Sequence, residues 1–216
     1  MAAEDAQAAG AGEAPIPPQI YVPVRLGERL FQGEIIEGVL EWIAKYDASD
    51  PDQVVGVEPR LQRLAVILSQ DCDLAQDWGR RQSELREVTD LRSVLMCPAW
   101  PAEQLREEQK LTTRRWEVVR QNKDERYAYL ADVPPSADGA GQGHPALLLD
   151  LASYFTVRTS ELYRQLRDTS GAPRRRCRLA TPWREHLQCR FAGYQARIGL
   201  PMDHFVPEGR RPSLPI

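Results

Sequence analysis

An unbroken apolar run, "LAVIL" at residues 64–68, is the feature that most constrains how this chain of 216 residues can fold. The run is too short for a buried helix, and its valine and isoleucine favour extended backbone, so it predicts a strand buried on both faces. We therefore expect residues 64–69 to form an interior strand of a sheet. The segment that follows, "SQDCDLAQDW", should then lie at the rim of the sheet, where functional side chains are common.

Strand and helix patterns continue on both sides of this run. We expect strands within 19–46, 91–99, 126–133 and 146–159, a surface loop at 46–62, and helices at 102–121, at 160–166 and after Pro182. In the last helix Thr181 is the expected N-cap, with Pro182 at the first helical position. Its apolar stripe consists of Trp183, Leu187, Phe191, Tyr194 and Ile198.

This order of elements predicts an α+β protein, a small twisted sheet or SH3-like barrel with covering helices, among them an amphipathic C-terminal helix. The segments should fall into five parts. We expect a disordered acidic tail at 1–18, a barrel-like β domain at 19–133 with the helix 102–121 inserted, a flexible loop at 134–145, strands and the final helix at 146–201 packing on the same core, and a tail at 202–216.

Charge is distributed unevenly along the chain. Residues 171–216 hold nine arginines against three carboxylates, a net charge of +6. Because the whole chain has a net charge of −3, residues 1–170 carry −9. Such polarity predicts a protein partner or nucleic acid bound at the basic end, or pairing of the two halves within the molecule. The candidate binding residues are Arg174, Arg175, Arg176, Arg184, Arg190 and Arg197.

The sequence predicts a cytoplasmic protein without a membrane segment. No apolar run approaches the roughly 20 residues that cross a bilayer, and the N-terminal segment lacks the basic start of a secretory signal. The four cysteines are scattered, with neither a C-x-x-C pair nor a disulfide-rich spacing. We therefore expect reduced thiols and no compact zinc site.

Three interpretations of the rim at residues 69–77 remain open. In the first, the rim is structural: Cys72 packs as a small apolar residue, and Asp73 caps a short helix. In the second, Cys72 is a nucleophile, for which His186 is the one histidine expected on a rigid element. The catalytic candidates are Ser69, Cys72, Asp73 and His186.

The third interpretation is a metal-dependent phosphodiesterase. Carboxylate oxygens are the ligands that Mg²⁺ prefers, and the rim has three aspartates within the seven residues 71–77. The expected ligands are Asp71, Asp73 and Asp77, with Glu34 or Asp150 able to join them from neighbouring strands. Under the other two interpretations we expect no cofactor.

Short motifs carry two resemblances. "SQDCDL" after the apolar strand, "RYAYL" and "HLQCRFAGYQARIGLP" resemble a group of uncharacterised bacterial proteins over most of residues 25–201. "GERLFQGEIIEGVLEW" followed by "RLAVILS" is similar to the opening of PemK/MazF-like toxins, with matches at Gly33, Glu34, Ile35 and Ser69. The second resemblance implies an SH3-like barrel that cleaves RNA without metal, although Leu64 stands where those toxins have proline.

Because the sequence shows no complete catalytic set, it favours binding over catalysis. We expect a non-catalytic binding or accessory component of a bacterial defence or toxin–antitoxin system, acting through the arginine-bearing C-terminal surface. The alternative is a nuclease or toxin, either PemK/MazF-like or dependent on Mg²⁺, that uses the rim at residues 69–77. A thiol-dependent hydrolase is the third possibility.

Overall fold

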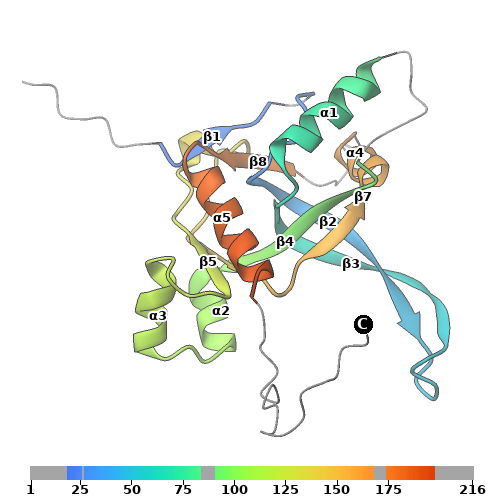
Figure 1. Cartoon of the computed structure of the whole chain (residues 1–216), viewed down its shortest axis with the longest axis horizontal. Coiled ribbons are helices and arrows are strands. Elements are labelled where there is room, and N and C mark those ends of the chain that lie inside the picture. The colour runs from blue at the N-terminus through green and yellow to red at the C-terminus, as the bar shows by residue number, and fades with distance from the viewer. Residues whose placement is uncertain (1–18, 26, 84–90, 168–173, 198–216) are drawn as a thin grey trace, which may run out of the picture.

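The computed structural model describes residues 19–25, 27–83, 91–167 and 174–197, and the expected tails at 1–18 and 202–216 lie outside these ranges. Within the described ranges the chain is mixed α and β (Figure 1). The strands are β1 (Tyr21–Pro23), β2 (Glu34–Tyr46), β3 (Val54–Ile67), β4 (Ser93–Pro101), β5 (Tyr127–Leu130), β6 (Leu147–Asp150), β7 (Phe155–Arg158) and β8 (Arg174–Leu179). The helices are α1 (Asp71–Gln82), α2 (Ala102–Glu108), α3 (Thr113–Arg120), α4 (Thr159–Arg167) and α5 (Trp183–Gln195), with a 3₁₀ turn at Pro135–Ala137.

The described strands form one antiparallel sheet in the order β1-β8-β2-β3-β4-β6-β5, and β7 pairs with β4 beside this path. The α+β class is therefore confirmed, but the sheet is open, so the SH3-like barrel is not. Its two end strands approach each other without a backbone ladder: the Tyr21 hydroxyl of β1 donates to the Ala131 carbonyl just beyond β5, at 2.5 Å. A side chain thus spans the gap that shared backbone hydrogen bonds would close in a barrel.

The expected interior strand is present at the centre of the sheet. β3 lies between β2 and β4, and its residues Ala65, Val66 and Ile67 are fully buried. Its two faces contact different apolar clusters: Val66 packs with residues from β6, β8 and α5, whereas Ala65 and Ile67 pack with residues from β4, β7 and α4. Burial on both faces is what the unbroken apolar run predicts.

The prediction of a surface loop at 46–62 is wrong for most of these residues. β3 begins at Val54 and pairs with β2 out to Tyr46, so only residues 47–53 form the turn. The aspartates and the proline of that turn are compatible with a loop, but the valines beyond them have strong β propensity and find partners on β2. The result is a hairpin with strands of 13 and 14 residues.

The helix expected at 102–121 is two helices, α2 and α3. The chain leaves the helical conformation at Lys110, whose φ is +50°, and the Thr112 hydroxyl then caps α3 by accepting from the Arg115 amide. The break lets Leu105 of α2 and Trp116 of α3 pack into the same cluster against β5 and β6. A single straight helix would carry these two side chains away from each other.

The C-terminal helix is present but begins one residue later than predicted. α5 starts at Trp183, with Pro182 at the N-cap position, and Thr181 contacts Glu185 with its side chain instead of capping the backbone. Leu187 and Phe191 are buried as the expected stripe requires, while Ile198 lies outside the described residues. None of the helices described has the length and apolar character that crossing a bilayer requires.

The connection at 134–145 is linked to β8 by hydrogen bonds, and the flexibility expected of it stays a prediction. Asp138 accepts backbone amide hydrogens from Ala140, Gln142 and Gly143, and it also binds the guanidinium of Arg176. Gly141 and Gly143, both at positive φ, supply the tight backbone path around this carboxylate.

Candidate functional site

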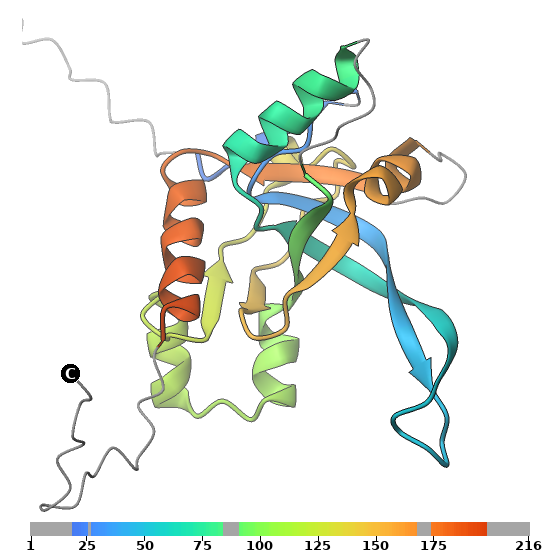
Figure 2. The same ribbon diagram turned by 45° about the vertical axis from the view of Figure 1, so that its right-hand side comes forward.

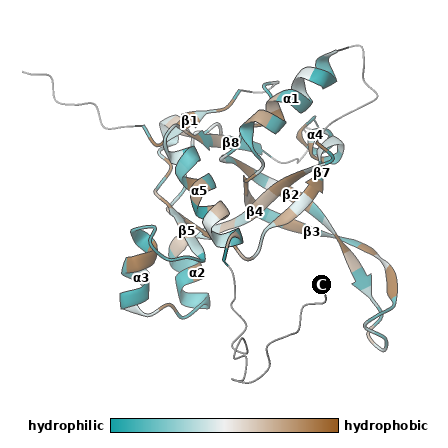
Figure 3. Ribbon diagram, viewed as in Figure 1, coloured by the Kyte–Doolittle hydropathy of each residue, from teal (hydrophilic) through white to brown (hydrophobic). Residues whose placement is uncertain are grey.

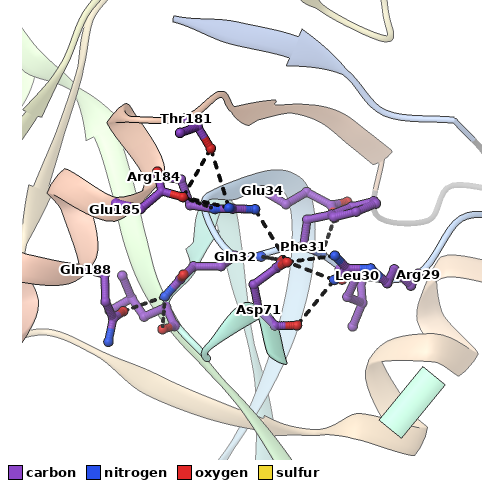
Figure 4. A network of polar contacts seen from close by, with 11 residues as sticks. Arg29, Leu30, Phe31, Gln32, Glu34, Asp71, Thr181, Arg184, Glu185 and Gln188 are labelled. Carbon is purple, nitrogen blue, oxygen red and sulfur yellow. Dashed lines mark hydrogen bonds and ion pairs between the residues drawn. The ribbon is translucent and has the colours of Figure 1, made fainter. Parts of the chain in front are cut away.

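The buried strand β3 ends at the rim, as the sequence predicts, and Figure 4 shows the polar network that forms around this end. β3 ends at Ile67, and α1 begins at Asp71 after a short turn. The Ser69 hydroxyl oxygen accepts the backbone amide of Leu95 at 2.8 Å, which ties the turn to β4. Ser69 therefore has a structural partner. Asp73 is not the N-cap, because Gln70 occupies that position.

Asp71 is the centre of this network. Its carboxylate accepts two hydrogen bonds from Arg29, at 2.7 and 3.0 Å, and one from the Gln32 amide at 3.2 Å. Arg184 of α5 approaches the same carboxylate at 3.4 Å (Figure 4). Partial burial acts to raise the pKa of Asp71, but the hydrogen bonds from Arg29 and Gln32 outweigh it, and the pKa lies below its usual range. Asp71 is thus a charged anchor whose oxygens are already used.

The network joins three segments that are distant in sequence. The Gln32 side-chain amide donates to the Leu68 carbonyl and to the Gln188 side chain on α5. Arg184 also binds Glu185 of its own helix at 2.6 Å. Hydrogen bonds between charged and amide groups therefore connect loop 29–32 to the start of α1 and to the first turns of α5. This arrangement stabilises the fold.

Cys72 and His186 do not form a nucleophile–base pair. Cys72 is exposed, and its sulfur lies 3.6 Å from side-chain oxygens of Gln70 and Asp73, which are acceptors. Such neighbours do not stabilise a thiolate. His186 instead lines a cavity of about 220 Å³ between α5 and the strands β5 and β8, beside Trp183. None of the contacts among the described residues links the thiol to this imidazole.

The carboxylates proposed as metal ligands are held in different places. Asp77 is buried and binds Arg81 at 2.6 Å, whereas Asp71 binds Arg29 and Asp73 is exposed. Each of the two auxiliary candidates also has an arginine partner: Glu34 with Arg175, and Asp150 with Arg126. Across the described residues no group of three or more His, Cys, Asp or Glu side chains is placed to hold a metal ion.

Two of the predicted binding arginines are buried inside the protein, which corrects the expectation of an exposed basic surface. The Arg175 side chain is 6% exposed and binds the buried Glu34 through two nitrogens, while donating to the Glu28 and Arg29 carbonyls. The Arg176 side chain is 2% exposed and binds both Asp138 and Glu37. Alternation along β8 turns these side chains to opposite faces, and each face supplies acidic partners.

Further arginines of the predicted set also have internal partners. Arg184 belongs to the Asp71 network, and Arg190 donates to the carbonyls of Asn122, Asp124 and Tyr127, which fixes α5 against the α3–β5 connection. Arg197 is half exposed and binds Glu125 at 3.1 Å. Arg174, at the start of β8, is exposed. Within the described residues, five of these six arginines thus contribute to ion pairs or carbonyl contacts inside the protein.

The feature that the sequence analysis missed is the outer part of the β2–β3 hairpin, residues 40–61, called the arm from here on. It extends away from the body of the protein without another element beside its outer end (Figures 1 and 2). At its base, the Gln165 side chain on α4 binds both backbone groups of Leu40. Beyond that point neither outer edge of the arm has a ladder partner among the described strands.

The two faces of the arm differ in chemistry. Residues paired across antiparallel strands share a face, and successive pairs alternate between faces. One set of alternate pairs is wholly apolar: Leu40–Leu61, Trp42–Pro59, Ala44–Val57 and Tyr46–Val54. These eight residues are called the apolar face. The intervening pairs are Glu41–Arg60, Ile43–Glu58 and Lys45–Gly56, which form a charged face.

The apolar face is open to solvent. Trp42, Tyr46, Val54, Val57 and Leu61 are between 52% and 68% exposed, and apolar residues continue along both strands of the arm beyond the body (Figure 3). At ordinary side-chain areas, the exposed fractions of this face amount to roughly 700 Å². A contiguous apolar surface of that size on a monomer is characteristic of an interaction site. Val54 and Val57 gave a signal in the sequence, because their β propensity argues against a loop.

Comparison of the chain with protein-family models, with curated proteins and with solved structures finds no match.

Proposed function

We propose that this chain is a non-catalytic binding protein that contacts a protein partner through the apolar face of the arm. The exposed apolar face carries the proposal, because five large apolar side chains in water cost free energy that burial against a partner would recover, at about 25 cal/mol per Å². The expected accessory role in a bacterial defence or toxin–antitoxin locus stays a prediction from the sequence.

The charged groups support this choice of surface. Apolar contact needs no free cations, and among the described arginines of the C-terminal segment Arg175, Arg176 and Arg190 are engaged inside the fold. The charged face of the arm carries one acidic and one basic member in the pair Glu41–Arg60, and Lys45 lies 4.0 Å from Glu58. With Asp47, Asp50 and Asp52 in the loop at its tip, the arm carries five carboxylates against two basic side chains, so it presents no positive surface for a nucleic acid backbone. A protein is therefore the partner class that fits the arm.

Site-specific photo-crosslinking tests the proposal. A benzophenone amino acid is placed at Val57 on the apolar face, and in a matched variant at the exposed Glu107 of α2, in cells that produce the full chain. We expect a covalent protein adduct from position 57 that position 107 does not give. If position 57 yields no more adduct than position 107, the arm is not a contact surface and the proposal fails.

The metal-dependent form of the nuclease alternative lacks a supporting geometry. It needs carboxylates free to bind a metal ion, but Asp71 and Asp77 each accept charge-assisted hydrogen bonds from an arginine. We expect purified protein to leave RNA and DNA intact with and without Mg²⁺ or Mn²⁺. Cleavage that is lost in Asp73→Asn, the variant of the exposed carboxylate, would reverse this conclusion.

A further inference from the structure

We infer that the partner of the apolar face is a second copy of this chain, so that two arms pack face to face as a four-stranded sandwich. This inference rests on the proposed function, since it names the partner of the same surface. Two sheets that pack through apolar faces lie about 10 Å apart and exclude water between them.

The area of the face is what a stable dimer needs. A standard interface buries about 800 Å² on each partner, and the apolar face exposes roughly 700 Å² at ordinary side-chain areas. One self-association through the arm would therefore cover the exposed apolar area.

The charge pattern of the face favours self-association. A two-fold axis places the same surface of both subunits against each other, so any net charge on that surface would repel itself. All eight residues of the apolar face are uncharged, and the ionised residues of the two strands fall on the opposite face. Interfaces between identical subunits are more apolar than other interfaces, with depleted charge at their centre. This face meets both conditions.

The aromatic residues give the face its anchors. Trp42 and Tyr46 lie four residues apart on β2, and each residue is about half exposed. Aromatic side chains are enriched among the residues that contribute most to binding, since they bury a large area at a small cost in side-chain entropy. In the dimer these two aromatic side chains would pack on the apolar face of the other copy.

Sedimentation of the full chain tests the inference. The chain has a mass of 24.5 kDa, and we expect the wild-type protein to sediment at twice this value. Measurements from low micromolar to about 100 μM cover the affinities of ordinary dimers. A wild-type protein that remains monomeric over this range overturns the inference without any variant.

Two adjacent substitutions provide a matched pair. Val57→Glu places one carboxylate of each copy in the apolar interface, and we expect the dimer Kd to rise at least about a hundredfold. Gly56→Glu adds the same side chain to the opposite face, opposite Lys45, where a new Cβ meets open space. We expect this control to remain a dimer. If Val57→Glu remains as dimeric as Gly56→Glu, the apolar face is not the interface.

The outcome also separates this inference from the proposed function. If crosslinking from position 57 captures a different protein while the chain sediments as a monomer, the arm is a binding surface and the second copy is not its partner. If the adduct from position 57 is the chain itself, with twice the mass of one copy, both conclusions are supported.

Discussion

Replacing Arg176 with methionine is expected to destabilise the protein strongly, because it removes one member of a buried ion pair. The guanidinium is 2% exposed and binds Asp138 through two nitrogens, at 2.5 and 2.6 Å, and Glu37 through a third. Methionine retains the unbranched stem but leaves the buried Asp138 carboxylate without a counter-charge. Removing one partner of such a pair costs about 3–5 kcal/mol of the free energy of unfolding.

The structure places the expected cost at the lower end of this range. After the substitution, Asp138 still accepts amide hydrogens from Ala140, Gln142 and Gly143, which solvate part of the charge. We therefore expect a loss of about 3 kcal/mol, which for a protein of this size corresponds to a decrease in Tm of roughly 6–12 °C. Replacing both partners, in R176M/D138N, should cost less than the sum of the single losses, because neither charge is then left alone.

Urea unfolding followed by circular dichroism measures these free energies. Arg174→Met is the control: Arg174 precedes the buried pair on the same strand but is exposed, so its loss should change stability by less than about 0.5 kcal/mol. If Arg176→Met costs less than about 1 kcal/mol, the argument that β8 arginines serve the fold is refuted.

Two further results follow from the same buried groups. The Arg176 guanidinium and three backbone amides outweigh the effect of burial and hold the pKa of Asp138 far below its ordinary 3.8. The stability contributed by this carboxylate is therefore present above about pH 4 and lost as the pH falls below it, so the free energy of unfolding should decline with acid more steeply in the wild type than in Asp138→Asn. Iodoacetamide should label the exposed Cys72 and Cys189 in the native protein, whereas Cys97 and Cys177 should react only after unfolding. Cys97 and Cys177 are buried, and burial raises the pKa of Cys177 to about 12. Mass spectrometry of the labelled peptides measures the labelling of each thiol, and equal labelling of all four thiols in the native protein would contradict the prediction.

The interior strand and the rim could be predicted from the sequence, because their signals are local. The five apolar residues 64–68 have few other ways to be buried, and the residues after them necessarily lie where the strand ends. The partners of the rim could not be predicted. Arg29 binds Asp71 across 42 positions of sequence, and Arg184 reaches it from α5. Contacts of this kind depend on how the sheet folds, which composition and periodicity do not contain.

The arm illustrates a second limit of sequence reasoning. Val54 and Val57 have the same β propensity as the buried valines of the sheet. The neighbouring sequence therefore does not distinguish a valine that packs in the core from one that is exposed on the surface. Only the arrangement of neighbouring strands decides this, because β4 and β8 pair with the inner parts of the hairpin and leave the outer edges of residues 40–61 without a further strand partner among the described strands. The length of the hairpin relative to its neighbours is therefore what creates the proposed site.

The charge polarity of the chain allowed both a basic binding surface and internal pairing, and the two make opposite predictions for the effect of salt on self-association. Glu34, Glu37 and Asp138 neutralise Arg175 and Arg176 inside the fold, so these two side chains offer no positive potential that could attract a partner. Contact through exposed cations weakens steeply as salt is added, since screening and counterion effects oppose it. Contact through the apolar face should be unchanged or strengthened, because salts such as sulfate favour apolar burial. We therefore expect the dimer Kd to stay constant or fall as the salt concentration rises, measured by sedimentation of the wild type beside Val57→Glu. A Kd that rises tenfold or more over the same range would assign the association to charged residues and would contradict an interface formed by the apolar face.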